Sequence, residues 1–207
     1  VVAALDSAAA GPVAEGCVGG GTGMCCHEFK GGIGTSSRVL PKEEGGYAVG
    51  VLVQANYGRR PELTIAGAPV GQQIPVSEVP GRDNTTEPVR PDQVDGSIIV
   101  VVATDAPLLA DQCKRLARRA GLGVGITGST AADGSGDIFV AFSTANRLDN
   151  SGERFSVETL NHARMNPLFT ATVEATHEAI VNALCMATTT RGIRGRVAHA
   201  LPLDRLR

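Results

Sequence analysis

The chain has 207 residues, of which 43% are hydrophobic and 19% charged, and its formal net charge is −2 at pH 7. This length and composition suit one globular domain, or part of a larger one, with a sizeable buried core. The small net charge and the 3% aromatic content argue against a nucleic-acid surface, which needs basic patches and stacking rings. No apolar run reaches the roughly 18 residues of a membrane span.

Residues 1–10 (VVAALDSAAA) resemble the end of an element whose beginning is missing. Residues 11–38 form a Gly-rich tract with too many apolar residues for a flexible linker. Within this tract, Cys25-Cys26-His27-Glu28 suggests metal ligands. Adjacent ligands rarely chelate one ion, however, and no partner cluster occurs elsewhere in the sequence. We therefore expect no metal site.

The five cysteines are odd in number and lack a C-x-x-C spacing. Reduced and mostly buried thiols in a reducing compartment are the favoured interpretation, so the expected location is the cytoplasm. A periplasmic location stays open, because a signal peptide could precede this sequence.

Residues 47–55 alternate as a β-strand does, and Asn56-Tyr57-Gly58 after them is a turn signal. Residues 59–95 are polar and contain six prolines. They predict an exposed connection.

At the centre of the chain, Ser97 directly follows Gly96 and opens a β-branched run that predicts a buried strand. A helix over residues 105–120 should follow, with Thr104 or Asp105 as its N-cap and Gly121 at its C-terminal end. One interpretation of this stretch is an ordinary turn, strand and capped helix. The other is a peptide bond that cleaves itself.

Self-cleavage would use the freedom of Gly96 to adopt strained angles that bring its carbonyl close to the Ser97 hydroxyl. An acyl shift from nitrogen to oxygen and hydrolysis would release Ser97 as a new N-terminus. A free α-amine has an ordinary pKa of about 7.7–8.0, so near neutrality it can serve as the general base for its own hydroxyl.

Residues 123–128 satisfy G-x-G-x-x-G, but the motif follows a predicted helix and leads toward a strand, the reverse of the order in dinucleotide-binding folds. Residues 138–143 predict a strand, and residues 167–187 have the helical period. Strands and helices without strict βαβ alternation favour an α+β fold. G-x-S-x-G is absent, and the four histidines form no clear triad with Ser97.

The segment from Asp95 to Leu109 closely resembles the start of the β-subunit in the P1 (DmpA-like) family of N-terminal-nucleophile peptidases. This family contains the L-aminopeptidase/D-esterase and β-peptidyl aminopeptidase group, whose precursors cut themselves between Gly and Ser. Two further blocks match in family order, at residues 11–35 and 134–146. The resemblance implies a four-layer αββα sandwich, also found in ornithine acetyltransferases. It implies one domain over 1–207, with 1–96 as the C-terminal part of the α-subunit and 97–207 as the β-subunit. Family precursors carry a much longer segment before the first block.

Three more residues are site candidates. Asn56 stands at the end of a predicted strand, where its side-chain amide could stabilise an oxyanion. By resemblance it matches the family's oxyanion-hole asparagine. The alternative is that Asn56 belongs to a turn and has a positive φ. Ser135 and Asp137 would share one face if a strand had begun there, and a polar loop is the alternative. By resemblance they match a serine and an acidic residue, often Glu.

The resemblance implies an aminopeptidase or amidase that acts on small peptides, amino-acid amides or esters through an acyl-enzyme on Ser97, with no cofactor. It also implies a homo-oligomer of αβ units. An acyltransferase of the same fold is one alternative, although its usual nucleophile is threonine. An inactive fragment or scaffold is another, because the family's substrate-site tyrosine lies in the upstream segment. No nucleic-acid or membrane partner is expected.

Overall fold

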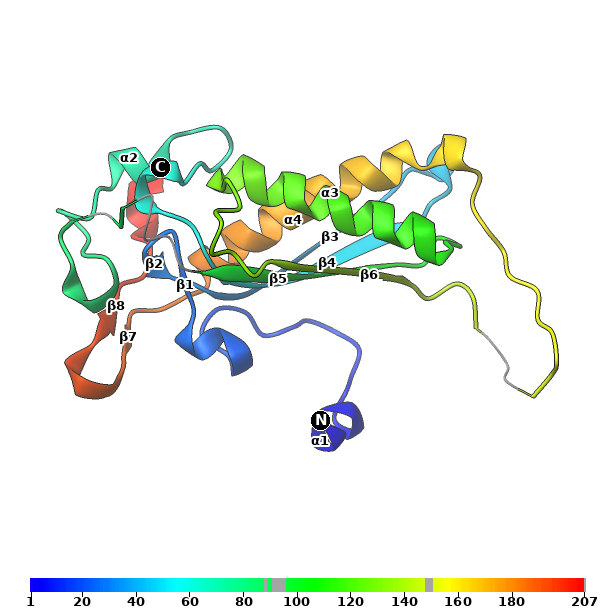
Figure 1. Cartoon of the computed structure of the whole chain (residues 1–207), viewed down its shortest axis with the longest axis horizontal. Helices are drawn as coiled ribbons and strands as arrows, with labels where there is room; N and C mark the ends of the chain where they lie inside the picture. The colour runs from blue at the N-terminus through cyan, green and yellow to red at the C-terminus, as the bar shows by residue number, and fades with distance from the viewer. Residues whose placement is uncertain (88, 91–95, 148–150, 207) are drawn as a thin grey trace.

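The computed structural model describes residues 1–87, 89–90, 96–147 and 151–206. Its centre is one four-stranded sheet (Figure 1). In order across the sheet, the strands are β3 (Gly32–Val39), β4 (Ala48–Asn56), β5 (Ser97–Thr104) and β6 (Ile138–Ser143). Strand β4 is antiparallel to both β3 and β5, whereas β5 and β6 are parallel. The remaining described elements are short: α1 (Val2–Asp6), η1 (Gly19–Gly23), β1 (Cys25–Cys26), β2 (Phe29–Lys30), η2 (Lys42–Glu44), η3 (Arg60–Glu62), α2 (Val70–Gln73), η4 (Arg82–Asn84), η6 (His162–Arg164), β7 (Thr190–Arg191), η7 (Ile193–Gly195), β8 (Val197–Ala198) and η8 (Leu203–Leu206).

Two long helices, α3 (Ala110–Gly128) and α4 (Asn166–Cys185), lie side by side on one face of the sheet (Figure 1). Helix α4 packs over β3 and β4, and α3 packs over β5 and β6. The strand period of two decides which side chains meet them: along β4, every second residue from Val49 to Ala55 is buried. Among the described residues, no helix is long and apolar enough to cross a bilayer.

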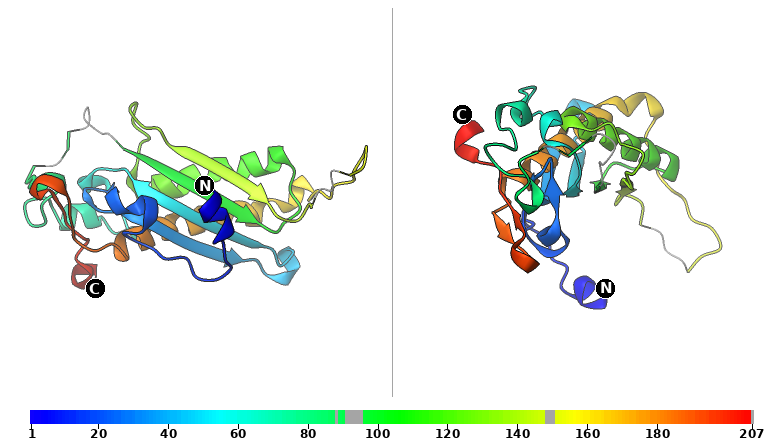
Figure 2. Two further views of the ribbon diagram at one scale, coloured as in Figure 1. Left: turned by 90° about the horizontal axis from the view of Figure 1, so that it is seen from below. Right: turned by 60° about the vertical axis from the view of Figure 1, so that its left-hand side comes forward.

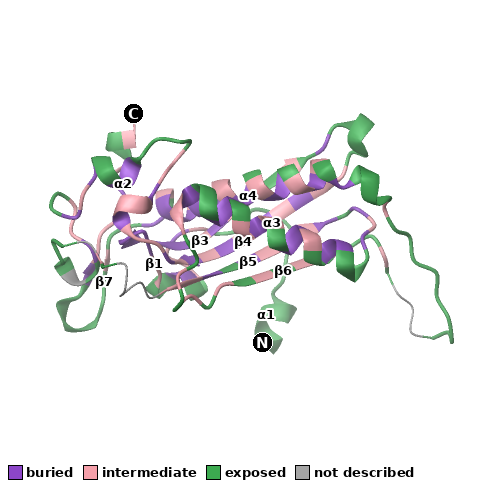
Figure 3. Ribbon diagram, turned by 45° about the horizontal axis from the view of Figure 1, so that its top comes forward, coloured by how far each residue is buried: buried purple, intermediate pink, exposed green. Residues whose placement is uncertain are grey.

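The other face of the sheet carries no helical layer in the described part of the chain. Figure 2 (left) looks onto this face, with the exposed helix α1 in front of the strands, and Figure 3 shows how much of β6 is exposed. Apolar side chains along β6 are about half exposed, at 51% for Ile138, 46% for Val140 and 46% for Phe142. The described chain therefore provides two of the four layers that the resemblance implies.

The predicted strands over 47–55, from Ser97 onward and over 138–143, and the predicted helix over 167–187, are confirmed to within two residues. The α+β class is confirmed too, although β5, α3 and β6 form a parallel crossover unit. Strand β3 was not predicted, because its GIGTSSRV sequence lacks the β-branched run that marks β5.

The prediction that residues 59–95 form an exposed connection is wrong for much of their described part. Leu63 and Ile74 are buried at 0% and 1% exposure, and Arg60 is buried at 1%. The Arg60 guanidinium lies 3.3 Å from the Phe29 ring centre and donates to four backbone carbonyls, those of His27, Glu28, Ile74 and Val79. These bonds tie residues 74 and 79 of the segment to the β1–β2 turn, so this part of the segment packs against the body of the fold.

The prediction of a helix over 105–120 is wrong at both ends. Neither Thr104 nor Asp105 is the N-cap. The Thr104 hydroxyl donates to Ala48 O at 2.7 Å and the Asp105 carboxylate accepts from Ala48 N at 2.8 Å, so both side chains bond β4. The helix begins at Ala110, where Gln112 Oε1 accepts from Leu109 N. It ends at Gly128, whose φ of +112° only glycine adopts readily.

The G-x-G-x-x-G motif therefore lies inside α3 and not after it, which corrects the predicted order. A Cβ on Gly123 would come within 2.7 Å of Thr176 Cβ on α4. The glycine permits a close approach of the two helices that a larger residue would prevent. This packing explains the motif without a dinucleotide.

Candidate active site

The candidate nucleophile and asparagine meet where β4 ends and β5 begins. Asn56 and Ser97 are directly paired in the antiparallel register, an arrangement that places Cβ atoms about 4.5–5.5 Å apart. The neighbouring Ala55 and Ile98 are fully buried. Because side chains alternate along a strand, Asn56 and Ser97 point to the face opposite the helices.

A backbone donor fixes the orientation of the Asn56 amide. The Cys25 N–H donates to Asn56 Oδ1 at 3.0 Å. The carbonyl end of the amide is thereby engaged, and Nδ2 is the end that can donate to a substrate oxygen. Asn56 belongs to β4 and is not among the residues with positive φ, so the alternative of a strained Asn turn does not apply.

The Ser97 hydroxyl is held by the loop that precedes β6. Gly136 N donates to Ser97 Oγ at 2.8 Å. A Cβ on Gly136 would lie 3.1 Å from the same oxygen, which is tighter than ordinary van der Waals contact. The loop therefore approaches the hydroxyl closely because residue 136 has no side chain.

Gly96 has a backbone conformation and surroundings that exclude other residues. Its φ is +146°, a region that L side chains rarely occupy. A Cβ there would lie 2.4 Å from Asn56 O and 3.1 Å from Tyr57 Cα. The carbonyl group next to Ser97 thus belongs to a residue whose local geometry any side chain would force to shift.

Asp137 and Ser135 both reach this region, but from a loop. Strand β6 begins at Ile138, so the premise that a strand already places both side chains on one face is wrong. Asp137 Oδ1 accepts from Ile98 N at 2.9 Å, one residue after the nucleophile. Ser135 lines a small cavity together with Gly96. The structure brings all five predicted residues to one end of the sheet.

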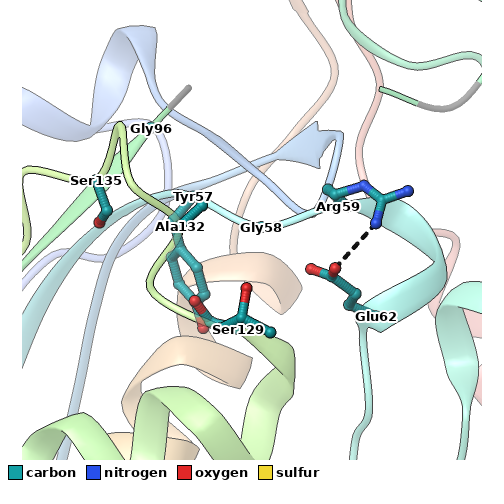
Figure 4. A pocket seen from close by; sticks show the side chains of 9 residues that line it. Tyr57, Gly58, Arg59, Glu62, Gly96, Ser129, Ala132 and Ser135 are labelled. Carbon is teal, nitrogen blue, oxygen red and sulfur yellow. Dashed lines mark hydrogen bonds and ion pairs between the residues drawn. The ribbon is translucent and has the colours of Figure 1, made fainter. Parts of the chain in front are cut away.

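This cavity has a volume of about 60 Å³ and lies between Ser135, Tyr57 and the Arg59–Glu62 ion pair (Figure 4). The two charged side chains are 3.1 Å apart. Burial holds the pKa of Tyr57 well above its usual range, so its hydroxyl stays neutral. A space of this size suits a few water molecules and not a peptide.

Sequence reasoning missed Tyr57, Arg59 and the backbone donors of Cys25 and Gly136. Tyr57 and Arg59 follow Asn56 directly, so their nearness to the site could have been inferred from the end of the strand. Backbone donors carry no residue-type signal. Only the glycine at position 136 hinted at a close approach.

The histidines and the Cys-Cys-His-Glu segment have other roles. His27 Nδ1 is 3.0 Å from Arg59 O, and burial lowers the pKa of His27 to about 4. His177 bonds Thr127 Oγ1 and His199 bonds Asn84 Oδ1, while His162 lies 2.7 Å from Arg115 Nη1. Within the described ranges, no group of three His, Cys, Asp or Glu side chains could hold a metal ion, and none of the five cysteines, all of which lie in these ranges, forms a disulfide.

Comparison with known proteins identifies the family. The sequence model of the family described as "Peptidase family S58" matches residues 1–198 of this chain. The chain belongs to peptidase family S58.

Relatives of this S58 chain have closely similar sequences and structures. Beta-peptidyl aminopeptidase BapA of Sphingosinicella microcystinivorans is 50% identical over 210 residues, covering 99% of this chain and 53% of that protein. A Burkholderia sp. beta-aminopeptidase superposes with a TM-score of 0.84 at 47% identity, over 98% of this chain and 55% of that one. The L-aminopeptidase D-Ala-esterase/amidase of Ochrobactrum anthropi gives 0.83 at 43% identity, over 98% and 54%.

The S58 chain spans about half the length of the curated relatives it matches. The Ochrobactrum structure is described as a variant of the Ntn hydrolase fold, which agrees with the predicted α+β sandwich. Family membership confirms the predicted resemblance to N-terminal-nucleophile aminopeptidases.

Proposed function

We propose that this chain carries the catalytic centre of a self-processing aminopeptidase that releases N-terminal residues from small peptides, amides or esters. The observation that carries the proposal is the Gly96–Ser97 junction. Only glycine fits the φ and the close contacts of residue 96 without a local shift, and the hydroxyl beside it is held by Gly136 N at 2.8 Å. No purely structural role at the start of a strand requires this combination.

In the processing step, Ser97 Oγ attacks the Gly96 carbonyl carbon and its proton passes to the leaving nitrogen. The C–N bond breaks, which yields an ester on Oγ and the free α-amine of Ser97. Water then cleaves the ester, leaving a carboxylate on Gly96 and restoring the hydroxyl. The small cavity beside Gly96 and Ser135 is a suitable place for that water.

In turnover, the released α-amine takes the hydroxyl proton while Oγ attacks the substrate carbonyl, and the same proton later goes to the leaving amine. Asn56 Nδ2 donates to the oxyanion, a contribution of roughly 3–4 kcal/mol in a comparable case. The carboxylate of Asp137, placed next to Ser97 through Ile98 N, stabilises the ammonium group that forms. Ser135 supplies a hydroxyl in the small cavity that Gly96 also lines. Water resolves the acyl-enzyme, and the reaction needs no cofactor.

The names of the relatives favour a peptidase over the acyltransferase alternative. The three proteins named above are a beta-peptidyl aminopeptidase, a beta-aminopeptidase and an L-aminopeptidase D-Ala-esterase/amidase. Serine at position 97 agrees with them, since the acyltransferases implied by the resemblance use threonine.

Mass spectrometry of the purified full-length protein tests the proposal. We expect two chains, one beginning Ser97-Ile98-Ile99, together with hydrolysis of amino-acid anilides. Ser97→Ala should give one uncut, folded chain without activity. Ser37→Ala, an exposed serine on β3, is the matched control and should be cut normally. A folded wild-type protein that remains one chain, or is cut elsewhere, contradicts the proposal.

A further inference from the structure

The small cavity beside Gly96 is lined by a residue whose buried hydroxyl the mechanism above does not use. Tyr57 lines this cavity together with Gly96 and Ser135. Tyr57 is 5% exposed, and its hydroxyl oxygen has no hydrogen-bond partner among the described residues. Leaving a buried hydroxyl without a hydrogen bond is unfavourable, which favours a small polar ligand at this place.

The hydroxyl of Thr127 on α3 lies close to that of Tyr57 but bonds other groups. Burial raises the pKa of Tyr57 and Thr127 partly opposes this rise, yet the two side chains do not reach hydrogen-bond geometry. Thr127 Oγ1 instead donates to Gly123 O at 2.9 Å and lies 3.0 Å from His177 Nδ1. The Tyr57 hydroxyl therefore remains able to bind a ligand.

Packing fixes the position of Tyr57 next to the junction. Its ring meets the His27 ring edge to face, with 5.0 Å between the centroids, and belongs to the buried core. Figure 4 shows the ring extending from the end of β4 toward Ser129. A Cβ on Gly96 would lie 3.1 Å from Tyr57 Cα. The hydroxyl is thus a fixed group beside the backbone that is to be cleaved.

The size and polarity of the cavity identify water as the ligand. Its volume is about 60 Å³, whereas one water needs only about 10–15 Å³ of such space. Other polar side chains line it: Arg59, Glu62, Ser129, Thr130 and Ser135. A water bonded to Tyr57 is therefore surrounded by further hydrogen-bonding groups, as buried waters require.

We propose that Tyr57 is a positioning residue for processing, and that its hydroxyl holds the water that cleaves the ester between Gly96 and Ser97. The inference rests on the proposed self-processing function, and it assigns to one side chain the water that this function needs.

The hydrolysis step follows from the chemistry of a neutral phenol. Its oxygen can accept a hydrogen bond, so Tyr57 holds the water by one O–H and leaves a lone pair of the water oxygen free to attack. That oxygen bonds to the Gly96 carbonyl carbon, and the bond from this carbon to Ser97 Oγ breaks. The other water proton passes through the α-amine of Ser97 to Oγ, which restores the hydroxyl and leaves a carboxylic acid on Gly96.

Tyr57→Phe tests this role, because it removes the hydroxyl and keeps the ring that packs against His27. Cleavage is followed over time in full-length precursor made by cell-free translation. Ser97 should still form the ester, but water should cleave it about tenfold more slowly, since it has lost the hydrogen bond that positions it.

Hydroxylamine separates loss of the water from loss of the ester. It attacks an ester directly, so adding it should restore cleavage of Tyr57→Phe to the wild-type rate. The released chain should then end in a hydroxamate at Gly96, which intact mass spectrometry distinguishes from the acid. The matched control is Tyr47→Phe, the same change at the chain's other tyrosine, which precedes the opposite end of β4. It should be cut at the wild-type rate without hydroxylamine.

Two results would overturn the proposal. One is cleavage of Tyr57→Phe in water at the wild-type rate. The other is slow cleavage that hydroxylamine does not accelerate, because a chain distorted or unfolded by the substitution forms no ester for hydroxylamine to attack. Failure of the self-processing function itself looks different: the wild-type chain would stay uncut both with and without hydroxylamine.

Discussion

Replacing Asp137 by Asn separates its charge from its hydrogen bond. Asp137 Oδ1 accepts from Ile98 N at 2.9 Å, and an Asn side chain offers an amide oxygen at the same place. The variant should therefore keep the link between the loop and β5. What it loses is the negative charge beside the α-amine of Ser97.

The size of the effect follows from that charge. Two unit charges 4 Å apart interact by about 4 kcal/mol at an effective dielectric constant of 20 and by about 1 kcal/mol in water. Asp137 is partly exposed, so we expect about 1–2 kcal/mol, or roughly a 5- to 30-fold decrease in kcat/KM at pH above the amine's pKa. The amine's pKa should also fall by about one unit, since 1.36 kcal/mol corresponds to one unit. The acidic limb of the pH–rate profile would then move to lower pH.

The assay is the pH profile of kcat/KM, measured with an ester or amide that lacks a free amine, because a substrate amine titrates in the same range. Asp133→Asn, an exposed carboxylate in the same loop, is the matched control and should leave the profile unchanged. Asp137→Ala removes the hydrogen bond as well and should lower the melting temperature, whereas Asp137→Asn should not. A destabilised Asp137→Asn with normal kcat/KM would refute the catalytic role and assign Asp137 to loop structure.

Two further predictions concern Gly96 and His27. Gly96→Ala should fold but accumulate as an uncut chain on denaturing gels. The reason is that a Cβ at this position would lie 2.4 Å from Asn56 O and that φ is +146°, so the Gly96 carbonyl would be displaced from Ser97. The control Gly134→Ala should be cut at the normal rate, and normal cleavage of Gly96→Ala would contradict the prediction. Burial lowers the pKa of His27 from 6.5 to about 4, so the folded state keeps it neutral while the unfolded chain takes up a proton below about pH 6.5. Stability should accordingly decrease as the pH falls from about 6.5 to 4, by about 1 kcal/mol between pH 7 and 5.5 from this group. Urea unfolding would measure the slope, which should be smaller in His27→Asn; equal slopes would show that His27 is not responsible.

The elements that sequence reasoning located correctly are those whose local pattern agrees with their packing. In β5, the run from Ile98 to Val102 is apolar and β-branched, and its alternate residues are buried under the helices. Helix α4 has small and apolar residues at the helical period, and these meet β3 and β4. In both cases the local preference and the tertiary contacts favour the same structure.

The errors arose where a distant contact outweighed the local pattern. Gly121 suggested the end of a helix, yet α3 continues to Gly128, and Gly123 within it lets α3 approach α4 closely. Prolines in 59–95 suggested exposure, whereas buried Arg60 holds carbonyls from several separate segments. Neither contact can be inferred from residues close by in the sequence.

The candidate site shows the same division between side chains and backbone. Sequence reasoning named Ser97, Asn56 and Asp137, but each is oriented by a backbone N–H, from Gly136, Cys25 and Ile98 respectively. A side-chain substitution removes only one end of each bond and leaves the donor in place. The donors themselves depend on how closely the chain segments approach, and at Gly96 and Gly136 that approach requires the absence of a Cβ. Substitutions at these two glycines, which contribute no side chain to the chemistry, should therefore perturb the geometry around Ser97 more broadly than the loss of any one functional group.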